Sequence, residues 1–221
     1  GVGADVLGAL TTGDNNTAVG LDSLKALTTG AENVALGASA LAAVTTGSFN
    51  HAFGKSAGVA LTTGDTNIAI GNAALATATT TSGNVAIGHS AMTATTTGVD
   101  NVAVGLNVMD ANTTGSNNTA VGKDALGANT TGEKNTAVGA SAGDAITTGS
   151  ANTTMGLESL TALTTGSNNV AIGEQALASG TTSASNTAVG RKAASTTTTG
   201  ESITAIGANT RASAATTNNQ I

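Results

Sequence analysis

Residues 118–132 read Asn-Thr-Ala-Val-Gly-Lys-Asp-Ala-Leu-Gly-Ala-Asn-Thr-Thr-Gly, and variants of this stretch follow one another along the whole chain. The glycine at its fifth place, Gly122, recurs every 17 residues from Gly3 to Gly207 with no insertion or deletion. A fixed period of this kind is typical of solenoids, in which each repeat forms one coil and is stabilised by its neighbours. The period therefore predicts the fold class before any other feature of the sequence.

The length of the repeat favours β structure. A coil of 17 residues is shorter than a strand–helix–strand unit, which needs roughly 30. It suits two short strands and two tight turns, and Thr-Ala-Val segments place β-branched residues at alternate positions. A helix over alanine-rich pieces such as residues 39–44 would last barely two turns, too short to be stable alone. We predict an all-β parallel β-solenoid of about 13 coils, one repetitive domain over residues 1–221 without an internal boundary.

Two glycines and one asparagine recur in nearly every repeat, and each has a predicted structural role. The recurring glycine and the glycine of Thr-Thr-Gly would give the backbone freedom for the corners. The recurring glycines, which we call the turn glycines, include Gly20, Gly37, Gly54, Gly71, Gly88, Gly105, Gly122, Gly139, Gly156, Gly173 and Gly190. The asparagine four residues before each of them would form a hydrogen-bonded ladder along the axis. Its members are Asn16, Asn33, Asn50, Asn67, Asn84, Asn101, Asn118, Asn135, Asn152, Asn169 and Asn186.

Two columns of large aliphatic residues are predicted to form the interior. The first column directly precedes the turn glycines and comprises Val19, Leu36, Phe53, Ile70, Ile87, Val104, Val121, Val138, Met155, Ile172, Val189 and Ile206. The second comprises Leu7, Leu24, Leu41, Leu75, Met92, Met109, Leu126, Leu160 and Leu177. Each coil would then bury only two or three large side chains, so that its stability depends on its neighbours.

The placement of charge indicates which positions face solvent. Counting each repeat from its glycine as position 0, all 13 acidic residues fall at positions 1, 2, 5, 11 or 12. Every lysine and arginine except Arg211 does the same. Unpaired charges are rarely buried, so these positions mark the solvated turns. Positions 6 to 10 and 13 to 16 carry no charge in any repeat, which predicts either a face buried against another chain or an exposed neutral strip.

Composition excludes several classes of protein. The net charge is −6, whereas a nucleic-acid-binding protein needs a basic face. The absence of cysteine removes disulfides and thiolate metal sites. No apolar run reaches the 18 residues of a membrane span. Phe49 and Phe53 are the only aromatic residues, so the interior must be thin and built from small side chains. The chain begins at Gly1, not Met, as a processed product or an excised segment does.

No constellation of residues indicates catalysis. A depolymerase would need paired carboxylates or a triad in a groove, but the carboxylates here are scattered over the turns. His51 and His89 stand at different places in the repeat, so they would not share a face. No calcium-binding β-roll motif is present. We predict no catalytic, cofactor-binding or metal-binding residue, and hence no enzyme.

The stretch at residues 118–132 resembles the repeats of phage tail-fibre proteins and bacterial surface proteins. The segment Val85-Ala86-Ile87-Gly88 is also similar to the head repeats of trimeric autotransporter adhesins, although those repeats are shorter than 17 residues. The resemblance covers the whole chain. It implies an extracellular β-roll or β-helix, often a side-by-side trimer, that serves as a shaft or adhesive stalk on a cell surface or a virion. Cell-surface glycans are a further candidate partner.

Three functional hypotheses follow. The favoured one is a structural fibre, either a self-associating extracellular filament or adhesive shaft, or a phage tail-fibre shaft for host attachment. The second is binding of ice or glycans by a threonine ladder, because Thr-Thr pairs recur in the repeat. Neighbouring strand residues face opposite sides, so only one threonine of each pair would join such an array. An enzyme is the third and least favoured. The threonine pairs could also pack within a strand or carry O-linked sugar.

The ends of the chain suggest how copies would join. The length is 13 × 17 = 221 residues, a whole number of repeats. Placing one copy after another creates the sequence Gln-Ile-Gly-Val-Gly, an additional approximate repeat motif. Unpaired strand edges recruit further strands, so we predict end-to-end contacts through Gly1, Val2, Gln220 and Ile221. A segment cut from a longer fibre protein, with flanking domains over both ends, is the alternative.

Overall fold

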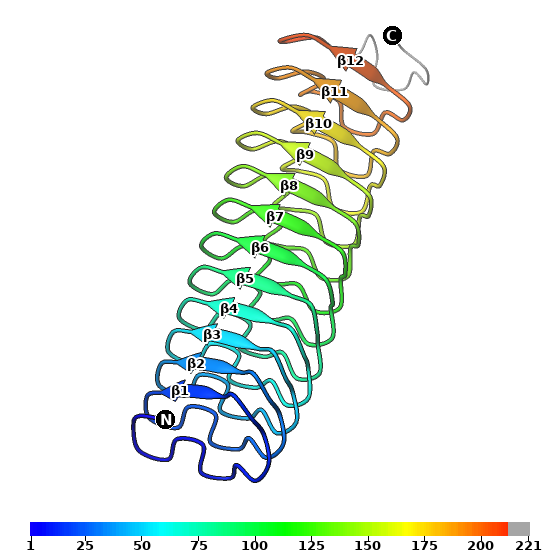
Figure 1. Ribbon diagram of the computed structural model, residues 1–221. Coiled ribbons are helices and arrows are strands. Elements are labelled where there is room, and N and C mark those ends of the chain that lie inside the picture. The colour runs from blue at the N-terminus through cyan, green and yellow to red at the C-terminus, as the bar shows by residue number, and fades with distance from the viewer. Residues whose placement is uncertain (212–221) are drawn as a thin grey trace. The chain divides into compact units, whose positions relative to one another are not determined.

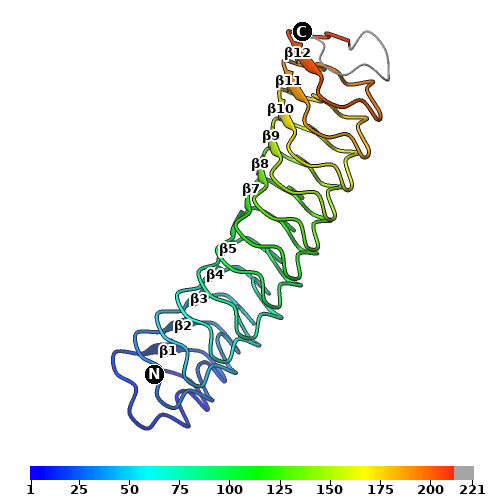
Figure 2. The same ribbon diagram turned by 90° about the vertical axis from the view of Figure 1, so that its right-hand side faces the viewer.

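The computed structural model describes residues 1–211. By its internal contacts the chain falls into two compact units, Gly1–Thr114 and a second that begins at Gly115, and each is described by itself. The described residues contain no helix, and each 17-residue coil contributes one short strand (Figure 1). Within each unit the coils stack on one another (Figure 2).

Every strand is three residues long and begins directly after the ladder position. The first unit holds β1 (Thr17–Val19), β2 (Val34–Leu36), β3 (His51–Phe53), β4 (Ile68–Ile70), β5 (Val85–Ile87) and β6 (Val102–Val104). The second unit holds β7 (Thr119–Val121), β8 (Thr136–Val138), β9 (Thr153–Met155), β10 (Val170–Ile172), β11 (Thr187–Val189) and β12 (Thr204–Ile206).

Neighbouring strands within each unit pair in parallel and in register. Ala18 lies beside Ala35 in the first unit, and Ala171 lies beside Ala188 in the second, so equivalent residues stack at a spacing of one repeat. The predicted fold class, a parallel β-solenoid with 17-residue coils, is confirmed. Twelve strands one repeat apart mark eleven turns, fewer than the 13 coils predicted. Val2 adds only an isolated bridge to Val19, and residues 212–221 lie outside the described part.

The second strand predicted in each coil is absent from the described residues. Its place is taken by turns in which alternate residues adopt the left-handed backbone conformation, as at Asp22 (φ 59°) and Leu24 (φ 50°). Left-handed residues interrupt the extended path of a strand. The backbone nevertheless bonds to the next coil, since the Leu24 N–H donates to the Ala40 carbonyl at 3.1 Å. Coils are therefore joined by hydrogen bonds on both sides of the solenoid.

The interior is formed by the middle residue of each strand and by the leucine column. The middle residues are alanines except for Thr154, and all are buried: Ala18, Ala35, Ala52, Ala69, Ala86, Ala103, Ala120, Ala137, Thr154, Ala171, Ala188 and Ala205. The leucine column is buried as predicted from Leu24 to Leu177, whereas Leu7 at its start is half-buried. Leu27, Val44 and Leu61 add a third buried column that the repeat analysis missed.

The first predicted apolar column does not lie in the interior, and this prediction was wrong. Val19 is 41% exposed and Met155 is 46% exposed. Side chains alternate across a strand, so burying the middle alanine turns both of its neighbours outward. The leucine column fills the same narrow interior, so the inward-facing middle residue of a strand has room for little more than the methyl group of alanine.

One coil departs from this pattern with a matched pair of polar residues. Thr154 replaces the middle alanine, and Ser159 replaces the alanine that follows the corner. Both are buried, and their hydroxyls hydrogen-bond to each other while Ser159 also donates to the Gly156 carbonyl at 3.0 Å. Gly143 in the preceding coil makes room, because a Cβ there would lie 3.2 Å from Cγ2 of Thr154. The added polar groups are thus satisfied within the coil.

The two sets of corner glycines have different roles. The glycines that follow the strands, from Gly3 to Gly207, have φ between 119° and 147°, a region that side chains rarely adopt. At Gly71, a Cβ would also overlap the carbonyl oxygen of Gly88. The glycines of Thr-Thr-Gly show no positive φ, contrary to the prediction that they supply corner freedom. Their small size matters instead, because a Cβ on Gly13 would overlap the carbonyl oxygen of Gly30 in the next coil.

Candidate functional site

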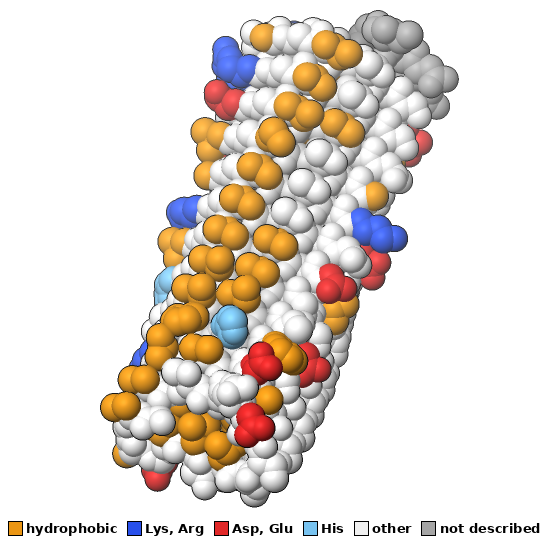
Figure 3. Space-filling model, viewed as in Figure 1, with side chains coloured by type: hydrophobic (Ala, Val, Ile, Leu, Met, Phe, Trp, Pro, Cys, Tyr) orange, Lys and Arg blue, Asp and Glu red, His pale blue; other side chains and the backbone are white. Residues whose placement is uncertain are grey.

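The outward face of the strands carries a band of apolar and uncharged polar side chains, which we call the outer strip. It consists of the first and third residues of each strand. In the first unit its third-residue column is Val19, Leu36, Phe53, Ile70, Ile87 and Val104, and in the second it is Val121, Val138, Met155, Ile172, Val189 and Ile206. Figure 3 shows hydrophobic side chains following the strands in this way. The outer strip carries no charged side chain. In the single chain these positions lie at the surface of each unit, so their burial against another chain stays a prediction.

A second neutral face is formed by the threonine pairs. The first threonine of a pair donates its hydroxyl to the backbone of the next coil, as Thr28 does to the Thr45 carbonyl at 3.0 Å. The second threonine is exposed in each coil of the part that the structure describes: Thr12, Thr29, Thr46, Thr63, Thr80, Thr97 and Thr114 in the first unit, and Thr131, Thr148, Thr165, Thr182 and Thr199 in the second. The pair lies in a bend, not a strand. The expected alternation between opposite sides therefore does not apply to it.

The asparagines stack in register and join successive coils. In the first unit, the Asn50 backbone N–H and side-chain Nδ2 both donate to Oδ1 of Asn33, at 3.0 and 3.2 Å. The same Nδ2 donates to the Gly64 carbonyl at 2.8 Å, which ties the strand to a corner of the following coil. The pattern repeats in the second unit, where Asn169 donates twice to Asn152. The ladder ends at Ile203, whose N–H donates to Asn186 Oδ1 at 2.9 Å but whose side chain has no amide.

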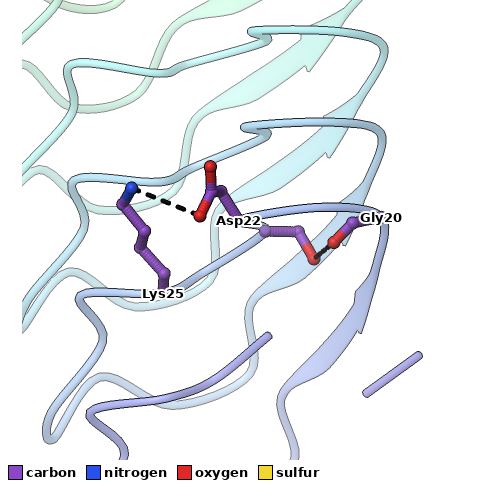
Figure 4. A network of polar contacts seen from close by, with 4 residues as sticks. Gly20, Asp22 and Lys25 are labelled. Atoms are coloured by element: carbon purple, nitrogen blue, oxygen red, sulfur yellow. Dashed lines mark hydrogen bonds and ion pairs between the residues drawn. The ribbon is translucent and has the colours of Figure 1, made fainter. Parts of the chain in front are cut away.

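Charged side chains lie on the turns, and ion pairs form there in both units. In the first unit, Lys25 Nζ lies 3.3 Å from Asp22 Oδ1 on the corner that follows Gly20 (Figure 4). In the second unit, Lys123 Nζ lies 3.3 Å from Asp124 Oδ2. Both lysine side chains are more than half exposed, so each ion pair contributes about 1 kcal/mol or less.

The carboxyl group of Asp144 is partly buried on a turn of the second unit. Burial raises the pKa of its carboxyl above the ordinary value, and the nearby carboxylates of Asp124 and Glu158 add to this rise. The backbone N–H groups of Ala145 and Asp144 lower the pKa and offset part of the change. One carboxyl oxygen, Oδ1, is buried without a hydrogen-bond partner.

The two histidines lie on different faces, as the repeat predicts. His51 is the exposed first residue of β3, whereas His89 lies on a corner with Nδ1 3.2 Å from the Asn72 carbonyl oxygen. Among residues 1–211, no group of three or more His, Cys, Asp or Glu side chains is arranged to hold a metal ion. Over the same residues, no helix has the length and apolar character needed to cross a bilayer.

The residues predicted to join copies end to end are only partly described. Val2 is 68% exposed and bonds to the next coil through its N–H, which donates to the Ala18 carbonyl at 2.9 Å. Gly1 is exposed beside it. Gln220 and Ile221 lie outside the described residues.

The chain's two phenylalanines and one histidine form a feature that the repeat analysis did not single out. Phe49, His51 and Phe53 alternate with Asn50 and Ala52, both of which are fully buried. Phe49 and His51 are exposed and Phe53 is half-buried, and we call these three residues the aromatic row. The signal was present in the sequence, because all the aromatic residues of the chain stand within five residues.

Comparisons of this chain with protein families, with curated proteins and with solved structures gave no match. Its assignment as a repeat protein of the β-solenoid class therefore depends on its own sequence and fold.

Proposed function

We propose that this chain is a structural fibre protein, a segment of a self-associating extracellular filament or adhesive shaft. The observation that carries the proposal is the set of hydrogen-bond ladders along the axis of each unit. Strand pairing, the asparagine ladder and the threonine hydroxyls each join a coil to the next. A force along the axis would load these bonds together. Such a repeat would resist extension along the axis of each unit, as a fibre protein must.

The outer strip supports association between copies side by side. Six strands at a spacing of about 4.8 Å and a width of three residues give an outer strip on the order of 300 Å² per unit, along which the third-residue column is apolar throughout. Contiguous exposed patches of this size are often functional. Packing the strips of two or three copies together would remove them from water, as in the trimeric fibres whose repeats this sequence resembles. A phage tail-fibre shaft and a bacterial surface filament both fit this organisation, and the full-length gene would distinguish them.

Replacing Met155 by Lys tests lateral association. Met155 is 46% exposed in the outer strip between Val138 and Ile172, so a lysine is tolerated in a single chain but would place a charge in the contact. We expect the wild type to sediment as a multiple of 20.8 kDa and the variant to associate at least about tenfold more weakly, a difference of about 1.4 kcal/mol.

Thr165→Lys is the matched control, because Thr165 is exposed in the same unit but lies on the threonine face. Its association should equal that of the wild type. A wild-type chain that stays monomeric at high concentration would contradict the lateral contact. Equal weakening by both variants would show that net charge, and not the strip, controls association. Electron microscopy of the same samples would distinguish filaments from short separate particles.

A second candidate function is favoured by the exposure of the threonine face. Both threonines of a pair lie in a bend, and in the coils of residues 1–211 the second is exposed throughout, while the first is exposed in several, including Thr79 and Thr96. The objection that only one threonine per coil could face outward therefore falls. Hydroxyl and methyl groups then repeat along each unit at about 4.8 Å, a spacing close to a lattice repeat of ice. Binding to ordered water at an ice surface is the function that this array would support.

Thermal hysteresis measurements test this candidate. If the threonine face binds ice, the wild type depresses the freezing point below the melting point. Thr63→Lys then removes most of the effect, because a long charged side chain interrupts the middle of the array. Thr17→Lys is the control, since Thr17 is equally exposed but lies on the sheet face. Absence of hysteresis in the wild type would exclude ice binding and leave the fibre proposal unaffected.

A further inference from the structure

The aromatic row is unusual in its exposure. Phe49 is 50% exposed, His51 is exposed and Phe53 is half-buried, so two phenyl rings and an imidazole are accessible to solvent within five consecutive residues. Large aromatic side chains normally contribute by being buried. Within residues 1–211 no other coil presents an aromatic ring. The row is thus a single local feature on an otherwise repetitive surface.

Two of its members also depart from the repeat. The strand partners of His51 in the neighbouring coils are Val34 and Ile68, so an imidazole interrupts an aliphatic column. Phe49 has φ 58°, a left-handed conformation that is unfavourable for a bulky residue and suits asparagine or aspartate. Glu32 and Thr66 occupy the equivalent place in the adjacent coils. A half-exposed phenylalanine gains little packing energy there, so its own coil does not explain it.

Polar groups surround the Phe49 end of the row. The Phe49 N–H donates to the Ala31 carbonyl at 3.0 Å, and the Thr66 N–H donates to the Ser48 carbonyl at 3.0 Å. These bonds stack Glu32, Phe49 and Thr66 in successive coils. Glu32 and Asp65 are exposed, and Asp65 Oδ1 accepts the Ser48 N–H at 2.7 Å. The carboxylates of Glu32 and Asp65 thus belong to the coils on either side of Phe49, and His51 follows it by two residues on the same coil.

We propose that the aromatic row binds a carbohydrate, namely a neutral polysaccharide of a cell surface. A pyranose ring has one face of C–H groups, which packs on a phenyl ring, and a rim of hydroxyls, which bond to carboxylate and imidazole groups. The row is open and not enclosed, so it fits an extended chain of sugars better than a small molecule, which needs a concave site. Glu32 and Asp65, together with the net charge of −6, select against anionic polysaccharides. The inference rests on the adhesive part of the proposed function.

The test uses cellohexaose, maltohexaose and mannohexaose as neutral probes and a heparin hexasaccharide as the anionic comparison. Titrations of the full chain are followed by calorimetry and by NMR shifts of residues 49–53. At least one neutral probe should bind with shifts at the row, and Phe49→Thr should weaken it at least about tenfold. Threonine is the residue already present at the equivalent Thr66, so this variant should fold. Phe49→Tyr keeps the ring and should keep the affinity.

Val102→Thr is the matched control, because Val102 is exposed on the same face three coils away, and threonine stands at the equivalent Thr17. It should bind sugar as the wild type does. Binding by none of the neutral probes, tighter binding of the heparin hexasaccharide, or equal loss in Val102→Thr would overturn the proposal. So would a loss of self-association in Phe49→Thr with sugar binding unchanged, since the row would then contact a second copy. Self-association that persists in Phe49→Thr leaves the fibre proposal standing whatever the sugar result.

Discussion

Replacing Ala86 by Asp is expected to unfold the coils around β5, with a loss of more than about 4 kcal/mol in the free energy of unfolding. Ala86 is fully buried in the middle of the strand. Its methyl group faces the leucine column, where Met92 of the same coil is also fully buried. An aspartate there would be too large for the space and would place a carboxylate among apolar side chains without a partner. Urea denaturation followed by circular dichroism would measure the loss.

The neighbouring residue provides the control. Ile87 belongs to the outer strip and is only half-buried, so Ile87→Asp keeps its carboxylate in water and should cost much less than Ala86→Asp. If Ile87→Asp proved the more damaging of the two, the strand would face the other way. The comparison therefore tests the assignment of inside and outside directly, with one substitution type at two adjacent positions.

The period and composition were sufficient to predict the fold class. An unbroken 17-residue repeat, with few aromatic residues and charges confined to certain positions, leaves a thin solenoid as the architecture that fits. The number of strands per coil was not predictable in the same way. Left-handed conformations at residues such as Leu24 and Leu41 replace the second strand. Leucine has no preference for that conformation, so stacking between coils imposes it, and the sequence carries no local signal of it.

The inside and outside of the strand were inverted in the prediction, and the reason is physical. Because side chains alternate along a strand, either the middle residue or its two neighbours can face the interior. The prediction placed the larger side chains inside. The better signal was how much the residue type at each strand position varies from one repeat to the next. The middle position is alanine in nearly every strand, whereas the third position accepts Val19, Phe53 and Met155. A tightly packed interior does not accept such differences in volume, so the variable position is the exposed one.

The candidate site was harder to predict because it depends on exposure. From the sequence, Phe53 is predicted to lie in an interior column and the scarcity of phenylalanine indicates a thin interior, since aromatic residues are usually buried. The grouping of Phe49 and Phe53 with His51 acquires meaning once Asn50 and Ala52 are known to face inward. The threonine pairs show the same dependence, because their shared outward direction follows from a bend that the Thr-Thr-Gly sequence alone does not distinguish from a strand.

Replacing Asn67 by Ala is expected to lower the free energy of unfolding by about 3 to 5 kcal/mol, since several buried groups lose their partners at once. Asn67 is 2% exposed, and its Nδ2 donates to Asn50 Oδ1 at 3.0 Å and to the Thr81 carbonyl at 2.9 Å. Its Oδ1 accepts the buried Asn84 N–H at 3.1 Å. Alanine leaves the Asn84 N–H and the Thr81 carbonyl without these bonds and opens a space in the ladder.

Asn72→Ala is the matched control, because Asn72 lies five residues away on the surface of the next corner and is exposed. The free energy of unfolding of Asn72→Ala should stay within about 0.5 kcal/mol of the wild-type value. Similar urea midpoints for Asn67→Ala and Asn72→Ala would mean that the ladder contributes little beyond strand pairing. A large difference would show that each ladder asparagine holds together the strand of one coil and the corner of the next. A short strand of three residues needs such a tie, because its own pairing supplies few hydrogen bonds.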